Sequence, residues 1–174
     1  MKRYITKEKL NHRIKELSSE ISNRIEGPIK IIGILKGAFM FMADLVRHFD
    51  SSVEIDFLTA RSYSGTISTG TLTYSTEHLP KVHNRNILLV DDIIDTGLTL
   101  SKLVDVFYAA GAKKVYTCTL LDKPARRKVD FKVDFSGFEI EDDFVIGYGM
   151  DFDEKYRNLS EIFVYEECTQ EENT

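Results

Sequence analysis

The sequence predicts an α/β fold, in which a mainly parallel sheet is covered by helices on both faces. Short, almost wholly apolar runs of strand length recur along the chain, as expected for strands buried on both sides. Segments with helical periodicity alternate with these runs, and such alternation is typical of parallel sheets. The 174 residues are 43% hydrophobic and 29% charged. This length and balance suit one globular domain, so we expect residues 1–174 to form a single domain.

The first predicted element is an amphipathic helix at residues 6–25. Its apolar residues recur at steps of three and four and form one stripe, made of Leu10, Ile14, Leu17, Ile21 and Ile25. Thr6 is a suitable N-cap, and Gly27 with Pro28 ends the helix. The next three elements are predicted to be a buried strand, a helix and an alternating strand, over residues 29–35, 38–49 and 53–60.

Residues 61–85 differ from their surroundings. The stretch RSYSGTISTGTLTYSTEHLPKVHNR is rich in Ser, Thr and Gly and lacks a clear core pattern. A stretch of this length without core residues inside a compact domain is usually functional or disordered. We therefore expect a flexible loop, in which TGTLTY (69–74) can form a short hairpin arm.

The second half of the chain alternates again. A buried strand is predicted at 86–92, and a helix then runs to about Ala110, where Gly111 suits its C-terminus. Three further strands are predicted over residues 113–121, 144–148 and 161–167. Residues from about 168 to 174 form a polar tail.

Charge and cysteine content exclude several protein classes. The net charge of −5 argues against a duplex-binding protein, because such proteins usually carry a basic face. An acidic chain can still bind a phosphorylated substrate at a locally positive site. Cys118 is interpreted as a core residue and Cys168 as part of the polar tail, and their spacing matches no metal site. The sequence shows no secretory signal and no apolar run of membrane-spanning length, which favours a cytoplasmic location.

The segment LLVDDIIDTGLTL (88–100) carries the chemistry. An apolar strand ends in two carboxylates, Asp91 and Asp92, and a short loop then leads into a helix. Ligands of open α/β sheets bind beyond the carboxyl ends of the strands. The helix N-terminus suits a phosphate, Gly97 lets the backbone turn tightly around the anion, and two threonines add hydroxyl donors. The carboxylates can accept hydrogen bonds from sugar hydroxyls or help to hold a divalent cation, so the segment predicts a phosphorylated-sugar site.

Other protein classes share parts of this segment. Acidic residues are common at strand ends, and an LLVDD string also occurs in phosphoacceptor receiver domains. In those domains the pair usually lies in the first strand, whereas here it lies mid-chain and is followed at once by DTGLT. The GxGxxG loop of dinucleotide-binding domains is absent. The segment therefore favours a phosphoribosyl ligand.

The segment resembles the phosphoribosyl pyrophosphate signature of type I phosphoribosyltransferases, and the chain from about 29 to 165 resembles their hypoxanthine-guanine branch. The motifs that carry the resemblance stand in the same order: ILKGAFMFMADL (34–45), ARSYSG (60–65), VDDIIDTGLTL (90–100), LLDKPARR (120–127) and FSGFEIEDDFVIGYGMDFDEKYRNL (135–159). The resemblance implies a type I phosphoribosyltransferase fold with a small hood, built from the N-terminal part and residues 124–145. It also implies purine salvage, in which hypoxanthine or guanine reacts with phosphoribosyl pyrophosphate to give IMP or GMP and pyrophosphate.

The resemblance assigns a role to each part of the 88–100 segment. Asp95 would act on purine N7 as a positioned general base. Asp91 and Asp92 would stabilise the oxocarbenium-like transition state electrostatically and are candidate metal contacts. The family often has Glu where this sequence has Asp91. No side-chain role is implied for Leu98. The expected set for ribose and 5-phosphate is Asp91, Asp92, Asp95, Thr96, Gly97, Leu98 and Thr99.

Three residues are expected to contact pyrophosphate. Lys36 and Gly37 resemble the pyrophosphate-binding loop, and the family implies a cis peptide between Leu35 and Lys36 that aims backbone N–H groups at the ligand. Arg157 resembles an arginine that contacts the same group.

Three more residues are expected to read the base. Lys123 resembles the lysine that donates to the purine O6, which favours 6-oxopurines over 6-aminopurines. Phe144 resembles the aromatic residue that stacks on the purine, and Val145 the residue whose carbonyl reads the base edge. The basic run that follows Lys123 is interpreted as solvated and without a role; it comprises Arg126, Arg127 and Lys128.

The resemblance also implies a metal and a lid. Magnesium is expected because the pyrophosphate leaving group is highly charged, and Asp151 resembles the carboxylate that reaches a second magnesium ion, directly or through water. Ser62 and Tyr63 begin the 61–85 loop, which closes over the active site in relatives and excludes water. Phosphoribosyl pyrophosphate and a 6-oxopurine are the expected partners, without nucleic acid or membrane.

Two alternative functions remain open at the level of the sequence. One is a regulatory binding module that kept the fold and lost catalysis, which the presence of Asp95 and the negative net charge disfavour. The other is a relative that acts on another base; Lys123 argues against adenine and pyrimidines, but xanthine stays open. The family further implies a homo-oligomer, a dimer or tetramer.

Overall fold

The computed structural model describes residues 1–50, 52–62, 72–74 and 79–166. Its main sheet has six strands in the order β4-β3-β2-β5-β6-β7. The pairs β3-β2, β2-β5, β5-β6 and β6-β7 are parallel, and β4 is antiparallel to the end of β3. The strands are β2 (Ile29–Leu35), β3 (Glu54–Ser62), β4 (Leu72–Tyr74), β5 (Asn86–Ile94), β6 (Lys114–Asp122) and β7 (Phe135–Glu139).

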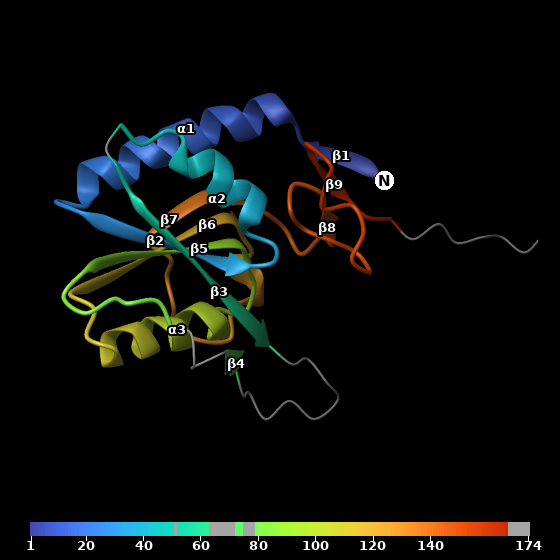
Figure 1. Ribbon diagram of the computed structural model, residues 1–174. Coiled ribbons are helices and arrows are strands. Elements are labelled where there is room, and N and C mark those ends of the chain that lie inside the picture. The colour runs from blue at the N-terminus through green and yellow to red at the C-terminus, as the bar shows by residue number, and fades with distance from the viewer. Residues whose placement is uncertain (51, 63–71, 75–78, 167–174) are drawn as a thin grey trace, which may run out of the picture.

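Helices cover both faces of this sheet, as the sequence predicts. Figure 1 shows α1 and α2 on one face and α3 on the other. Thr6 caps the first helix, because its hydroxyl accepts the Lys9 N–H at 3.4 Å. The helices are α1 (Lys7–Arg24), α2 (Phe39–Val46) and α3 (Leu98–Ala109), with a short 3-10 helix, η2 (Pro124–Arg126), after β6. None of the helices in the described part of the chain is long and apolar enough to cross a membrane.

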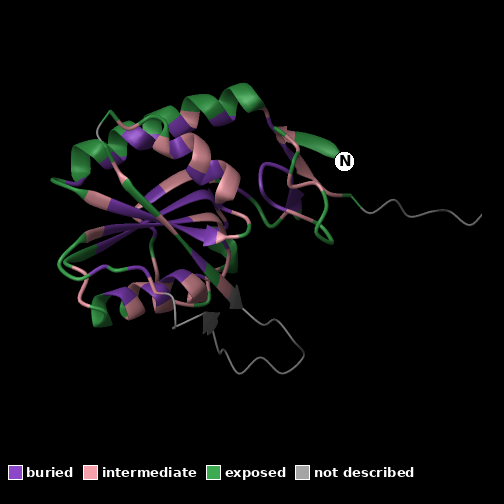
Figure 2. Cartoon of the chain, viewed as in Figure 1, coloured by how far each residue is buried: buried purple, intermediate pink, exposed green. Residues whose placement is uncertain are grey.

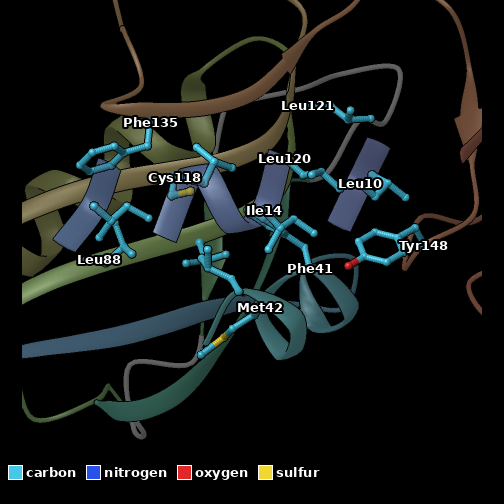
Figure 3. Close-up of a cluster of buried hydrophobic side chains, with 14 of the residues drawn as sticks. Leu10, Ile14, Phe41, Met42, Leu88, Cys118, Leu120, Leu121, Phe135 and Tyr148 are labelled. Atoms are coloured by element: carbon cyan, nitrogen blue, oxygen red, sulfur yellow. The ribbon is translucent and has the colours of Figure 1, made fainter. Parts of the chain in front are cut away.

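The sheet separates two cores. On the α1/α2 face, the stripe predicted from the sequence packs against strand residues that include Leu88 and Cys118, so the interpretation of Cys118 as a core residue is confirmed. Figure 3 shows these side chains meeting between the helices and the strands. On the other face, Leu103 and Phe107 of α3 pack against residues such as Leu89. Burial is therefore concentrated in the strands and the inner faces of the helices (Figure 2).

A second, three-stranded sheet is built from an N-terminal strand and two C-terminal strands, and it forms the hood. Its order is β1-β9-β8, and both pairs are antiparallel. The strands are β1 (Lys2–Ile5), β8 (Val145–Ile146) and β9 (Ile162–Val164). The prediction that residues 124–145 build the hood is wrong for much of this segment, because β7 joins the main sheet beside β6. Figure 1 shows β1, β8 and β9 together at one end of the molecule.

Candidate active site

The carboxyl ends of β2, β3 and β5 open onto one cleft of about 510 Å³. Predicted ribose, phosphate and pyrophosphate residues from two distant segments share its wall. The lining residues are Ile34, Leu35, Lys36, Gly37, Ala60, Asp91, Asp92, Ile93, Ile94, Asp95, Thr96, Gly97, Thr99, Leu100, Arg126 and Lys128. Leu98 does not line the cleft, in agreement with the absence of an expected side-chain role.

The paired carboxylates lie near the end of β5. The Asp92 N–H donates to Asp91 Oδ1 at 3.1 Å. Burial and the neighbouring Asp92 carboxylate raise the pKa of Asp91 well above its ordinary value, and burial also raises the pKa of Asp92. Ionising both carboxylates is therefore unfavourable in the free protein, because they are partly buried and close to each other. Hydroxyl donors or a cation from a ligand would reduce this electrostatic free-energy cost.

The loop after β5 is shaped to receive an anion. Gly97 has φ +79°, a left-handed conformation that favours glycine, and it stands as the N-cap of α3 without a side-chain hydrogen bond to the helix. Thr96 Oγ1 accepts the Leu98 N–H at 3.3 Å. Because Thr96, Gly97 and Thr99 all line the cleft, the N-terminus of α3 faces its space.

Arg127 holds this loop by hydrogen bonds to its backbone, so the interpretation of Arg127 as a solvated residue is wrong. Its Nη1 donates to the Asp95 carbonyl oxygen at 2.5 Å and to the Ile94 carbonyl oxygen at 3.3 Å. Its Nη2 donates to the carboxylate of Asp122, and the side chain is only 16% exposed. Its basic neighbours Arg126 and Lys128 are exposed, as predicted, and both of them line the cleft. Arg127 was missed because its partners near Asp95 lie over 30 residues away in sequence.

The predicted pyrophosphate loop lies against the carboxylate pair. The peptide between Leu35 and Lys36 is cis, which confirms the expectation from the family. Gly37 is needed for a close approach, because a Cβ atom at this position would overlap the carboxylate of Asp92. A Cβ atom at Gly149 would likewise overlap the Gly37 carbonyl oxygen. The loop between β8 and β9 (residues 147–161), here called the hood loop, therefore packs directly on the Lys36-Gly37 turn.

Two further contacts hold the hood loop in place. The Tyr148 hydroxyl donates to Asp44 Oδ2 of α2 at 2.5 Å. Burial and the Asp44 carboxylate raise the pKa of Tyr148, so its hydroxyl stays a donor. Arg157 Nη1 donates to the Gly149 carbonyl oxygen at 2.8 Å. The loop that carries Asp151 is thus tied to α2 and to Arg157.

A smaller cleft of about 190 Å³ adjoins the first one and shares part of its wall. It contains the three residues predicted to read the base, together with Asp151. Its lining residues are Asp92, Ile93, Asp95, Lys123, Phe144, Val145, Met150 and Asp151. Since Asp92, Ile93 and Asp95 line both clefts, the predicted sugar site and the predicted base site meet there.

Lys123 is buried in this smaller cleft with two carboxylates near its ammonium group. Its Nζ lies 3.8 Å from Asp95 Oδ1 and 3.9 Å from Asp142 Oδ1. Asp142 also pairs with Arg126 Nη1 at 2.9 Å. The Asp95 Oδ1 atom is buried and lacks a hydrogen-bond partner in the described structure, so its capacity to accept a hydrogen bond is unused there. Asp142 was not predicted, since nothing distinguishes it from the other three acidic residues of EIEDD (139–143).

Phe144 offers an exposed aromatic face beside the cleft, with 52% of its surface accessible. Its ring makes edge-on contacts with Phe152 at 5.8 Å and with Tyr165 at 6.0 Å between centroids. Phe152 and Tyr165 in turn stack at 4.3 Å. A large exposed aromatic ring held by two others is suited to stacking on a planar ligand.

The donor set fits a magnesium ion carried in by a phosphorylated ligand better than a metal held by protein alone. Within the described ranges, no group of three or more His, Cys, Asp or Glu residues can hold a metal. Magnesium is usually bound by one or two carboxylates together with substrate phosphates and water. Asp151 from the hood and Asp92 from β5 line the same cleft and suit that arrangement.

The predicted lid residues are only partly described. Ser62 is the last residue of β3, and the β3-β4 pairing agrees with the expected short arm. Tyr63 and most of the 61–78 stretch lie outside the described residues, as does the tail from residue 167. The lid therefore stays a prediction.

Comparison with known proteins agrees with this geometry. The profile of the phosphoribosyl transferase domain matches residues 3–153. The chain is 44% identical over 169 residues to the hypoxanthine-guanine phosphoribosyltransferase of Bacillus subtilis, covering 96% of this chain and 94% of that protein. It is 42% identical to the hypoxanthine phosphoribosyltransferase of Escherichia coli, covering 89% of each chain.

Solved structures give the same picture. A crystal structure of a hypoxanthine-guanine phosphoribosyltransferase from Bacillus anthracis superposes with a TM-score of 0.90 at 43% identity, covering 95% of this chain and 99% of the other. A hypoxanthine phosphoribosyltransferase from Staphylococcus aureus superposes with a TM-score of 0.88 at 36% identity, covering 95% and 91%. Similarity thus extends over nearly the whole of each chain.

Proposed function

The chain belongs to the phosphoribosyltransferase family, and we propose that it transfers the 5-phosphoribosyl group of phosphoribosyl pyrophosphate to N9 of hypoxanthine or guanine. The products are IMP or GMP and pyrophosphate, which places the enzyme in purine salvage. The observation that carries this proposal is the junction of the two clefts at Asp92, Ile93 and Asp95. One cleft offers an anion-binding loop beside sugar-binding carboxylates, and the other offers a lysine and an aromatic ring for a base.

The sugar phosphate is held by the α3 N-terminus in this proposal. Backbone N–H groups and the hydroxyls of Thr96 and Thr99 would surround the 5-phosphate, while the carboxylates of Asp91 and Asp92 accept hydrogen bonds from the ribose hydroxyls. As the bond to pyrophosphate breaks, positive charge develops on the ribose ring. The two carboxylates stabilise that charge, because they are already in place and poorly solvated.

The base is oriented by three contacts. Its ring stacks on Phe144, its O6 accepts a hydrogen bond from the Lys123 ammonium group, and its N7 faces Asp95. The buried and unpartnered Asp95 Oδ1 is positioned to take or steady the N7 proton while N9 attacks the sugar. A 6-amino group would leave the Lys123 donor without an acceptor, which disfavours adenine.

The leaving pyrophosphate is held by Lys36, the Gly37 backbone and Arg157 in this proposal. Bound magnesium would supply charge neutralisation to the phosphate oxygens, with Asp151 and the Asp91-Asp92 pair as its protein contacts. The expected cytoplasmic location stays a prediction.

Assembly into a homo-oligomer is the final part of the proposal. Ile55 and Phe57, two positions apart on β3, have 48% and 46% of their surfaces exposed, and adjoining exposed apolar side chains can mark a protein–protein interface. Light scattering during size-exclusion chromatography tests this part. A dimer or tetramer is expected, and a monomer at micromolar concentration would contradict it.

The function is tested by a spectrophotometric assay with magnesium and phosphoribosyl pyrophosphate, in which hypoxanthine, guanine, xanthine and adenine are offered separately. Turnover of hypoxanthine or guanine that requires magnesium is expected. Preference for xanthine would identify the xanthine-specific alternative. Binding of phosphoribosyl pyrophosphate without turnover of any base would instead support the regulatory module, with nucleic-acid binding as the next measurement.

A further inference from the structure

Glu154 lies between the two cations that are expected to bind pyrophosphate. Its Oε2 atom is 2.7 Å from Lys36 Nζ and 3.5 Å from Arg157 Nη2. The two cations come from different parts of the fold, since Lys36 follows β2 and Arg157 precedes β9. One carboxylate oxygen therefore bridges the two cations of the site.

The backbone around Glu154 is folded into a turn that presents this carboxylate. Asp153, Glu154 and Tyr156 have positive φ angles of 52°, 59° and 73°, a region that non-glycine residues rarely occupy. The Glu154 N–H donates to Asp151 Oδ2 at 2.9 Å, which secures the turn. Three such residues within four positions indicate that the surrounding contacts determine the turn.

Arg157 retains unused capacity for an anion even with Glu154 in place. Its Nη2 lies 2.8 Å from Asp151 Oδ1, and its Nη1 donates to Gly149. Its Nε is buried and has no hydrogen-bond partner among the described residues. A buried donor without a partner is uncommon in native proteins and points to a missing acceptor.

We propose that Glu154 is an internal anion that occupies the pyrophosphate position in the empty enzyme and competes with pyrophosphate for Lys36 and Arg157. This inference rests on the proposed function. The bridge is exchangeable, because the side chains of Lys36 and Glu154 are 55% and 65% exposed and such ion pairs hold weakly in water. Pyrophosphate carries several negative charges and displaces the single carboxylate on binding. When product leaves, Glu154 returns to the cations and opposes rebinding.

The competition predicts a direct effect on ligand affinity. Glu154→Gln keeps the shape of the side chain and removes its charge, so magnesium pyrophosphate should bind the variant more tightly, by roughly three- to tenfold, as expected for loss of one exposed competing charge. The KM for phosphoribosyl pyrophosphate should fall as well, because this substrate carries the same pyrophosphate group. If release of pyrophosphate limits turnover, kcat should also fall.

Isothermal titration with magnesium pyrophosphate separates the inference from its alternatives. Asp153→Asn is the matched control, because it removes the same charge one residue away, where the carboxylate pairs with Lys155 at 3.6 Å. Tighter binding by Glu154→Gln but not by Asp153→Asn supports the inference. Equal affinity in wild type and Glu154→Gln, or equal gains in both variants, overturns it.

A second variant guards against an effect of folding. Glu154→Asn introduces a residue that tolerates positive φ, and its shorter side chain also lacks the charge. Thermal unfolding identifies any variant with a damaged hood, and the two Glu154 variants should show the same gain in affinity; a gain in neither counts against the competition. If no form of the protein binds magnesium pyrophosphate or turns over a base, the proposed function itself fails, which is a different result.

Discussion

The Lys123 ammonium group faces the Asp95 carboxylate at 3.8 Å, and the Asp95 Oδ1 atom nearest to it has no hydrogen-bond partner in the described structure. The distance is too long for a hydrogen bond, so the two groups stand apart while still attracting each other. A 6-oxopurine that turns its O6–N7 edge toward this pair would accept from Lys123 at O6 and meet Asp95 at N7. One pair of residues thus couples recognition of the base to its activation, and both halves of this arrangement can be tested separately.

Asp95→Asn tests the general-base role. The substitution preserves the size of the side chain and removes its ability to take a proton, so kcat should fall by about 10²- to 10⁴-fold, the usual contribution of general base catalysis. Steady-state kinetics with hypoxanthine measures this loss. Affinity for phosphoribosyl pyrophosphate, measured by titration, should change little. A variant with near wild-type kcat would exclude Asp95 as the base.

Lys123→Ala tests recognition of the 6-oxo group. The KM for hypoxanthine should rise roughly tenfold to a hundredfold, because a hydrogen bond to a charged group contributes about 1.5–3 kcal/mol. The preference for 6-oxopurines over adenine should weaken as well. Lys9→Ala, on the exposed surface of α1, is the control that should behave as wild type. An unchanged base profile in Lys123→Ala would refute the assignment.

Gly37→Ala tests the close packing of the pyrophosphate loop on Asp92. The added Cβ overlaps the carboxylate, so the loop or Asp92 must move, and overpacking of this kind costs about 1–3 kcal/mol. Binding of phosphoribosyl pyrophosphate should weaken in parallel. Gly27→Ala separates the two effects. It strains a residue with φ +83° that has open space around it, so stability should fall while ligand binding is retained.

Arg127→Met tests whether this arginine positions the phosphate loop. The substitution keeps much of the apolar stem and leaves the Asp95 carbonyl oxygen and the Asp122 carboxylate without their donor. The KM for phosphoribosyl pyrophosphate should rise at least tenfold, whereas a purely structural role would lower the melting temperature without changing KM. Arg127→Lys should restore little, since an ammonium group cannot span the same acceptors.

Asp91→Asn tests the electrostatic cost of the paired carboxylates. Because the folded protein raises the pKa of Asp91, the unfolded chain releases this proton first as pH increases, and wild type loses stability from about its ordinary pKa of 3.8 up to the raised value. The variant does not titrate there. Its stability advantage in urea, with chelator present, should therefore be small at pH 3.5 and larger at pH 7, while its activity falls. No gain at pH 7 would contradict the raised pKa.

The sequence predicted the parts of the fold that are local. The β5-loop-α3 unit was readable because strand, glycine and helix follow one another within 25 residues, and the apolar stripe of α1 reports its buried face directly. The short strand β1 was not predicted, since KRYI is basic and its partner β9 lies about 160 residues away. Propensity says little about so short a strand, because its partner determines it.

The same distinction applies to the site. Asp91, Asp92 and the loop at 95–97 could be predicted from the residue pattern of the 88–100 segment. Roles for Lys36 and Arg157 could be predicted only from the resemblance to the family. Arg127 and Glu154 could not be found, since each has a decisive contact with a residue more than 30 positions away, Asp95 and Lys36 respectively. In the sequence, a charged residue at the surface cannot be distinguished from one that supports a loop, because the partners of the second are brought near only by the fold.

The pairing of β1 with β9 has a consequence for how the enzyme matures. The strands that meet in the hood are separated by nearly the whole chain, so this contact closes a very long loop and is made late in folding. The phosphate loop and the main sheet can form while the ribosome is still adding the last segments. The loop between β8 and β9, which carries Asp151 and Arg157, is completed only afterwards. A nascent chain can therefore form the anion-binding loop before Phe144, Val145 and Asp151 complete the cleft for the base.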